Sequence, residues 1–141
     1  MIKSSAINSR QIPTIGAVAA GLLVLSLIGG GLAVALHVNS LADAFGNQAE
    51  MAAPWPMLLL LVVGGTVAAK GQGWRGVLGT LLVAIPCVAG LASIGDDEVF
   101  RQGLPAVTYA YQVFILVASA AGLAACAQHL RTLTRGNAVA H

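Results

Sequence analysis

Two cysteines and three histidines are the residues best suited to redox or metal chemistry, and their positions keep them apart. Cys87 falls near the middle of one apolar stretch and Cys126 at the inner end of another, so we expect their depths in a membrane to differ by about 12 Å. A disulfide requires Cα atoms within about 7 Å of each other. His37 and His129 flank apolar stretches at opposite membrane faces, about 30 Å apart, and His141 is the last residue. We therefore predict no cofactor and no metal, and we interpret both cysteines as small packing residues.

An acidic cluster at Asp96, Asp97 and Glu98 is the strongest candidate for a surface site. Together with Asp43 and Glu50 it would place all five carboxylates of the chain on one face, where they could attract a divalent cation or a basic partner. The spacing matches no calcium-binding loop, and a solvated loop is the simpler interpretation. No Ser–His or Glu–His pair with usable spacing accompanies the cluster. We therefore predict that the protein is not an enzyme, and catalysis by these acids is the least favoured hypothesis.

Within its apolar stretches the chain offers amide and hydroxyl groups but no charge. Gln112 is the strongest of these groups, and such a side chain more often bonds a neighbouring helix than a substrate. Transporters and proton relays normally retain an ionisable residue at membrane depth. Because these stretches contain no ionisable residue, a small homo-oligomeric channel or transporter is only our alternative hypothesis. Its path would be lined by Gln112, Thr80 and the region at Gly29–Gly31.

The composition of the chain requires a membrane around these residues. Of 141 residues, 57 % are hydrophobic and 9 % are charged, whereas globular domains have about 45–50 % and 25 %. Seven Lys or Arg and five Asp or Glu cannot cover the surface of a soluble fold, and a net charge of +2 is far from that of a nucleic-acid binder. Uncharged stretches long enough to cross a hydrocarbon core of about 30 Å as helix lie at about 12–36, 52–69, 76–95 and 104–127.

The charges predict how these four spans are oriented. Six of the seven basic residues would lie on one side of the membrane, and the positive-inside rule makes this side and both termini cytoplasmic. A cleavable signal peptide with its site at 42–44 is the alternative, although the first apolar stretch, at about 25 residues, exceeds a usual h-region of about 7–15. We predict a single all-α domain in the plasma membrane, most simply the bacterial inner membrane. Its cytoplasmic tail covers about 128–141, and we expect the part from Thr132 to His141 to be disordered, or at most lightly docked.

Several residues predict local features of the helices and loops. Three consecutive glycines at Gly29–Gly31 should distort the first helix, and Pro86 should kink the third. Ser40 resembles the start of a short helix in the outer loop. Trp55 and Trp74 fall at opposite ends of the second span, where indole rings anchor at the level of the lipid headgroups.

Small residues spaced by four predict close helix contacts, because packing rather than water exclusion drives helix association in lipid. These candidate packing positions are Ala17, Gly21, Gly29, Ala33, Gly65, Ala69, Ala118 and Gly122. The spacing leaves open whether they act within one protomer or between protomers. With no catalytic constellation, we predict an accessory or scaffold subunit in the lipid bilayer, whose partner is another membrane protein or a second copy of itself. We expect no nucleic-acid partner.

Overall fold

A computed structural model describes residues 12–37, 40, 42–44, 46, 53–93, 103 and 105–138 of the chain. These residues form α1 (Ile12–Ala35), α2 (Trp55–Lys70), α3 (Trp74–Ala92) and α4 (Ala106–Ala138). The described part of the chain contains no strand, so the predicted all-α class is confirmed. Three helices, α1, α3 and α4, are long and apolar enough to cross a membrane, which indicates a membrane protein. With 16 residues, α2 is apolar but shorter.

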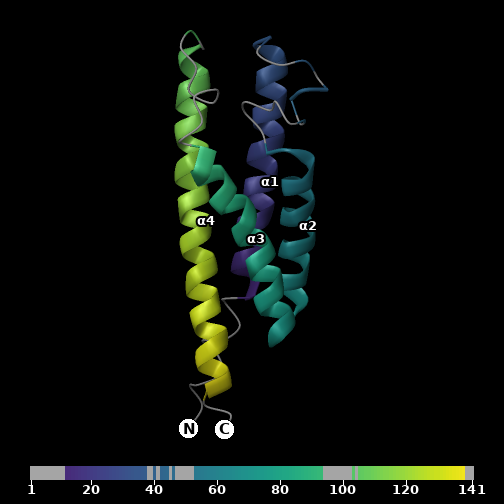
Figure 1. The fold of residues 1–141 in the computed structure, drawn as a ribbon, viewed down its shortest axis with the longest axis vertical. Coiled ribbons are helices and arrows are strands. Elements are labelled where there is room, and N and C mark those ends of the chain that lie inside the picture. The colour runs from purple at the N-terminus through teal and green to yellow at the C-terminus, as the bar shows by residue number, and fades with distance from the viewer. Residues whose placement is uncertain are drawn as a thin grey trace.

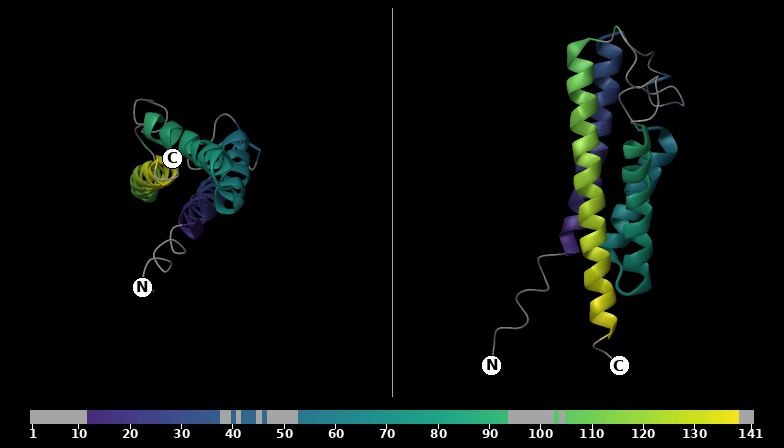
Figure 2. Two further views of the ribbon diagram at one scale, coloured as in Figure 1. Left: turned by 90° about the horizontal axis from the view of Figure 1, so that it is seen from below. Right: turned by 60° about the vertical axis from the view of Figure 1, so that its left-hand side comes forward.

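The four helices alternate in direction and lie side by side (Figure 1). Each helix packs against the next along the chain, and α1 also packs against α4. The start of α1, the α2–α3 turn and the end of α4 therefore lie at one end of the molecule (Figure 1). In the end-on view, α3 crosses from α2 toward α4 (Figure 2).

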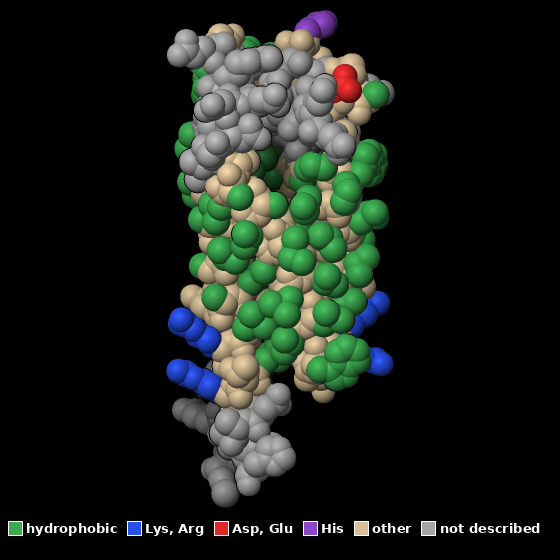
Figure 3. Space-filling view, viewed as in Figure 1, with side chains coloured by type: hydrophobic (Ala, Val, Ile, Leu, Met, Phe, Trp, Pro, Cys, Tyr) green, Lys and Arg blue, Asp and Glu red, His purple; other side chains and the backbone are tan. Residues whose placement is uncertain are grey.

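Charged side chains separate between the two ends (Figure 3). Lys70, Arg75, Arg131 and Arg135 are all the lysines and arginines that the structure describes, and they lie at the lower end in Figure 3. We call this the basic end. Asp43, the one carboxylate among the described residues, lies beyond the other end of α1. Between the two ends, the surface is made mostly of hydrophobic side chains.

The helices differ in length, and their first residues show why. At about 1.5 Å per residue, α2 is roughly 24 Å long and α3 roughly 28 Å, whereas α1 reaches about 36 Å. Pro54 precedes α2 and Pro56 lies in its first turn, where a missing N–H costs nothing, so α2 begins at Trp55 rather than near 52. Gly73 precedes α3 with a positive φ of 59°, which lets the chain turn within a few residues.

The end of α4 corrects the sequence prediction. The helix continues to Ala138, so the expectation of disorder is wrong for residues 132–138, whereas 139–141 lie outside the described residues. Periodicity in this segment is weak, but its position beside α3 supports it. A Cβ placed on Gly76 of α3 would lie 3.4 Å from the Leu133 side chain, which shows that the two helices still contact each other here.

Two predicted irregularities are not breaks in the helices. The chain stays α-helical through Gly29–Gly31 and through Pro86.

In the outer loop, Ser40 Oγ donates to the Asp43 carboxylate at 2.6 Å and accepts the Asp43 N–H at 3.2 Å. The Ala44 N–H also donates to the Ser40 carbonyl oxygen at 2.9 Å, so the described residues form one turn at 42–44. The other residues of the predicted short helix lie outside the described residues.

The α2–α3 hairpin is held by contact between two backbones. A Cβ placed on Gly79 of α3 would lie 2.3 Å from the backbone nitrogen of Ala68 on α2. A Cβ on Gly64 of α2 would lie 2.9 Å from the carbonyl oxygen of Gly79. No side chain fits at either position without moving a helix. As predicted, these two segments are antiparallel neighbours (Figure 1).

Contacts on α1 complete the core. A Cβ on Gly65 of α2 would lie 2.7 Å from the Ala19 side chain of α1, so these helices also approach closely. The buried residues that meet between the four helices are Ile15, Ala19, Leu61, Ala68, Val83 and Cys126.

We expect Gly79→Ala to lower the free energy of unfolding by about 2 kcal/mol or more, because its Cβ would push two backbones apart. Denaturation in mixed detergent micelles, followed by helical circular dichroism, measures this change. Gly136→Ala is the matched control, since nothing lies within 4 Å of its Cβ position. Equal stability of the two variants would contradict the close contact.

Candidate functional site

Most buried polar side chains of the described residues lie on one face of α4. Spacings of three, four and seven residues align them along that helix, where they face the interior. We call this row the polar stripe of α4. It consists of the buried polar residues Thr108, Gln112, Ser119 and His129, with the buried Gly122 and Cys126 between them on the same face. From the sequence, Gln112 was predicted as a polar position inside the membrane but the stripe was not. Its spacing becomes visible once α4 is known to be one continuous helix.

The stripe is packed tightly against α1 and α3. A Cβ on Gly122 would lie 3.0 Å from Cys87 Sγ on α3 and 3.4 Å from the Leu22 side chain on α1. A Cβ on Gly90 of α3 would lie 2.8 Å from the Ser119 hydroxyl oxygen. Glycine at 90 and 122 therefore brings the three helices together around the lower half of the stripe.

Hydroxyl groups near the stripe bond mainly to backbone carbonyls. Tyr111 donates its hydroxyl to the carbonyl oxygen of Leu25, which links α4 to α1. Thr80 donates to Gly76 of its own helix at 2.7 Å. The Thr108 hydroxyl is buried and has no hydrogen-bond partner among the described residues. The Tyr111 bond joins two helices, whereas the Thr80 bond stays within α3. Each of these two hydroxyls already donates its single hydrogen, so neither can donate to a ligand as well.

The two predicted polar positions inside the membrane do not meet. Thr80 lies in the second turn of α3, which begins at the basic end. Gln112 lies in the second turn of α4, which begins at the opposite end. Both side chains are buried, at nearly opposite ends of the interior. Thr80 and Gln112 therefore do not line a common path through the protein.

The two cysteines lie closer in depth than the sequence predicted. Cys87 contacts Gly122, which is one helical turn from Cys126 on the same face of α4. Their depths therefore differ by about one turn, roughly 6 Å, rather than 12 Å. The error came from ending the fourth span near 127, which placed Cys126 at a helix end. Both thiols are buried and free.

The predicted packing residues divide into buried and exposed sets. Gly65 and Ala69 face α1, while Gly29, Ala33 and Gly122 are buried and Ala118 is half-buried. Ala17 and Gly21 are exposed instead. The four α1 positions do not share a face, because eight residues separate Gly21 from Gly29 and rotate the side chain by about 80° beyond two full turns.

The predicted outer acidic cluster, Asp96, Asp97 and Glu98, lies outside the described residues. Within the part of the chain that the structure describes, no three His, Cys, Asp or Glu side chains gather as they would around a metal ion.

Comparisons with protein-family models, with curated proteins and with solved structures find no match for this chain. The class that the fold itself defines is an all-α protein with three apolar helices of membrane-spanning length.

We expect Tyr111→Phe to lower the free energy of unfolding by about 1 kcal/mol, because it removes the hydrogen bond between α4 and α1. Unfolding in mixed micelles checks this value. Thr66→Val is the control, because the Thr66 hydroxyl bonds only Val62 of its own helix. If both variants were as stable as the wild type, the Tyr111 bond would not stabilise the bundle.

Proposed function

We propose that this protein is a non-catalytic accessory or scaffold subunit that crosses the plasma membrane four times. In this proposal, the outer face of α1 packs against a transmembrane helix of another membrane protein or of a second copy. The observation that carries the proposal is a row of exposed residues on α1. At the two glycines of this row, no described atom lies within 4 Å of an added Cβ. The bacterial inner membrane is the location that we propose from the positive-inside pattern.

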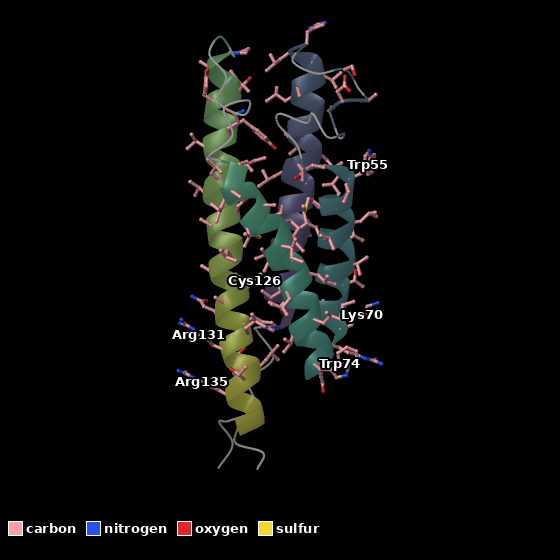
Figure 4. All side chains as sticks on the ribbon, in the orientation of Figure 1. Trp55, Lys70, Trp74, Cys126, Arg131 and Arg135 are labelled. Carbon is pink, nitrogen blue, oxygen red and sulfur yellow. The ribbon has the colours of Figure 1, made fainter. Side chains whose placement is uncertain are left out.

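Alternating helix directions and the position of the cations support four spans with both ends cytoplasmic. All four described cations lie at the end where α1 begins and α4 ends. Lys70 and Arg75 flank the α2–α3 turn at that end (Figure 4). Although α2 is only about 24 Å long, local bilayer thinning of a few ångströms accommodates such a helix at modest cost.

We expect reporter fusions at residue 1 and residue 141 to give the same result, with both reporters cytoplasmic. A third fusion in the 38–52 loop should be on the opposite side, because one helix separates it from the N-terminus. Paired alkaline phosphatase and fluorescent-protein reporters measure this. Termini in opposite compartments would contradict the four-span topology.

The exposed row on α1 has the spacing of a helix-packing seam. Steps of four and three residues repeat along it without a break, as in the contact line between two helices. We call it the α1 seam, and it consists of Ala17, Gly21, Val24, Ile28, Gly31 and Ala35, all exposed. Small residues at its two ends let a second helix approach closely, and the branched residues at its centre offer stiff packing surfaces.

Contacts among the described residues do not explain the two glycines of the α1 seam. Each glycine in a helix costs about 1 kcal/mol relative to alanine. Gly65 and Gly79 offset this cost through contacts that no side chain would permit. Nothing lies within 4 Å of a Cβ placed on Gly21 or Gly31. A partner helix on this face would give these two positions the same role.

The α2–α3 hairpin presents an outer surface that differs from the α1 seam. Its exposed side chains on α2 and α3 are large and apolar: Leu59, Val62, Val63, Leu78, Leu81, Ile85 and Val88. Lipid chains cover such a surface readily.

The channel or transporter alternative has less support, because Thr80 and Gln112 lie at opposite ends of the interior.

We expect Gly21→Leu combined with Gly31→Leu to weaken partner association at least tenfold, because both side chains would occupy the space that a helix needs. Cross-linking in native membranes, followed by co-purification in mild detergent, measures the association. Helix content should not change, since both positions are open in the monomer.

Gly136→Leu is the matched control, because its Cβ position is equally open and lies outside the α1 seam. A wild-type chain that is strictly monomeric and free of partners would overturn the proposal. Equal association of the seam variant and the control would also overturn it.

A further inference from the structure

The basic end carries positive charge that no described acid balances. Its four cations, Lys70, Arg75, Arg131 and Arg135, are all exposed. Asp43, the one described carboxylate, lies at the other end of the molecule. This surface is therefore open to anions from outside the described residues.

The first pair of cations surrounds an exposed indole. Lys70 ends α2 and Arg75 is the second residue of α3, so the two flank the hairpin turn. Trp74 is 70 % exposed, and the guanidinium carbon of Arg75 lies 5.8 Å from the centroid of its ring. An indole next to cations is typical of the headgroup layer, where the ring meets glycerol and acyl chains and the charges meet phosphates.

The second pair lies on α4. Arg131 and Arg135 are four residues apart and both exposed, so their guanidinium groups project from one face, one turn apart. Like charges at this spacing repel each other. A phosphate between them would remove the repulsion, and a guanidinium can bind it through two parallel hydrogen bonds.

Both pairs lie where the apolar surface ends (Figure 3). They project from different sides of the molecule, α4 on one side and the hairpin turn on the other (Figure 4). A single acidic peptide would have to bridge these sides, whereas lipid headgroups surround a membrane protein at this level on every side.

We propose that the basic end binds anionic phospholipid headgroups, one set at Lys70, Trp74 and Arg75 and another at Arg131 and Arg135. This inference needs the chain to lie in a bilayer but does not depend on the α1 seam. Its test can therefore fail or succeed separately from the test of the accessory function.

The two tryptophans make the test direct, because one lies at each end of the hairpin (Figure 4). Trp55 is 60 % exposed, and no described lysine or arginine lies at its end. Trp55→Phe leaves Trp74 as the reporter at the basic end, and Trp74→Phe leaves Trp55 as the internal control. Each single-tryptophan protein is reconstituted into bilayers that contain phosphatidylcholine with brominated phosphatidylglycerol, or the reverse. Quenching of the fluorescence then gives the relative affinity for the anionic lipid at each end.

At Trp74 we expect a preference for phosphatidylglycerol of about fivefold for each cation that contacts the headgroup, and at Trp55 we expect none. Lys70→Gln with Arg75→Gln should bring the ratio at Trp74 close to one. Arg131→Gln with Arg135→Gln should leave that ratio unchanged and lower the number of phosphatidylglycerol molecules retained in native mass spectrometry.

Circular dichroism of each variant verifies that the helices are intact, as expected for exposed positions. Equal quenching by both lipids at Trp74 would overturn the proposal. A preference of the same size at Trp55, or one that survives loss of Lys70 and Arg75, would overturn it as well.

Discussion

Contact between helix backbones is the interaction on which this structure depends. In lipid, water exclusion does not pull helices together, so close packing and hydrogen bonds must do so. At the α2–α3 contact, a Cβ on Gly79 would lie 2.3 Å from the Ala68 nitrogen. At Gly65 and Gly122 a side chain of the neighbouring helix lies against the glycine, which connects α2 to α1 and α4 to both α1 and α3. The 17 glycines of the chain thus include several that fix where each helix can lie.

The sequence predicted the helices well because lipid solvation acts on each stretch separately. Uncharged length gave the all-α class and all four helices, and prolines and glycines account for the starts of α2 and α3. Contacts between helices were less predictable. The end of α4 was missed because Leu133 depends on Gly76, a residue distant in sequence. The depth of Cys126 was wrong for the same reason, since it was measured from a helix end that lies elsewhere.

The candidate site shows the limit of sequence reasoning more clearly. Spacing by four marked Gly21 and Gly29 as members of one row, but helical rotation puts them on different faces. The face of each residue is fixed only when the neighbouring helices are known, because a helix in lipid can be apolar all round. The Tyr111 bond to Leu25 was not predictable either, because its partner is a backbone carbonyl that no side-chain pattern reveals.

The proposed partner and lipid surfaces occupy different parts of the molecule, and their chemistry is consistent with a division between helices. The described cations belong to α4 and to the α2–α3 hairpin, so headgroups at the basic end would fix the depth of these three helices. The outer face of α1 has no charge among its described residues and carries exposed glycines instead. Because α1 packs against its neighbours at Gly65 and Gly122, its depth in the membrane would be fixed together with theirs. The seam would then face a second helix at a constant depth. A fixed level matters because a seam with a repeat of three and four residues fits its partner in only a few registers.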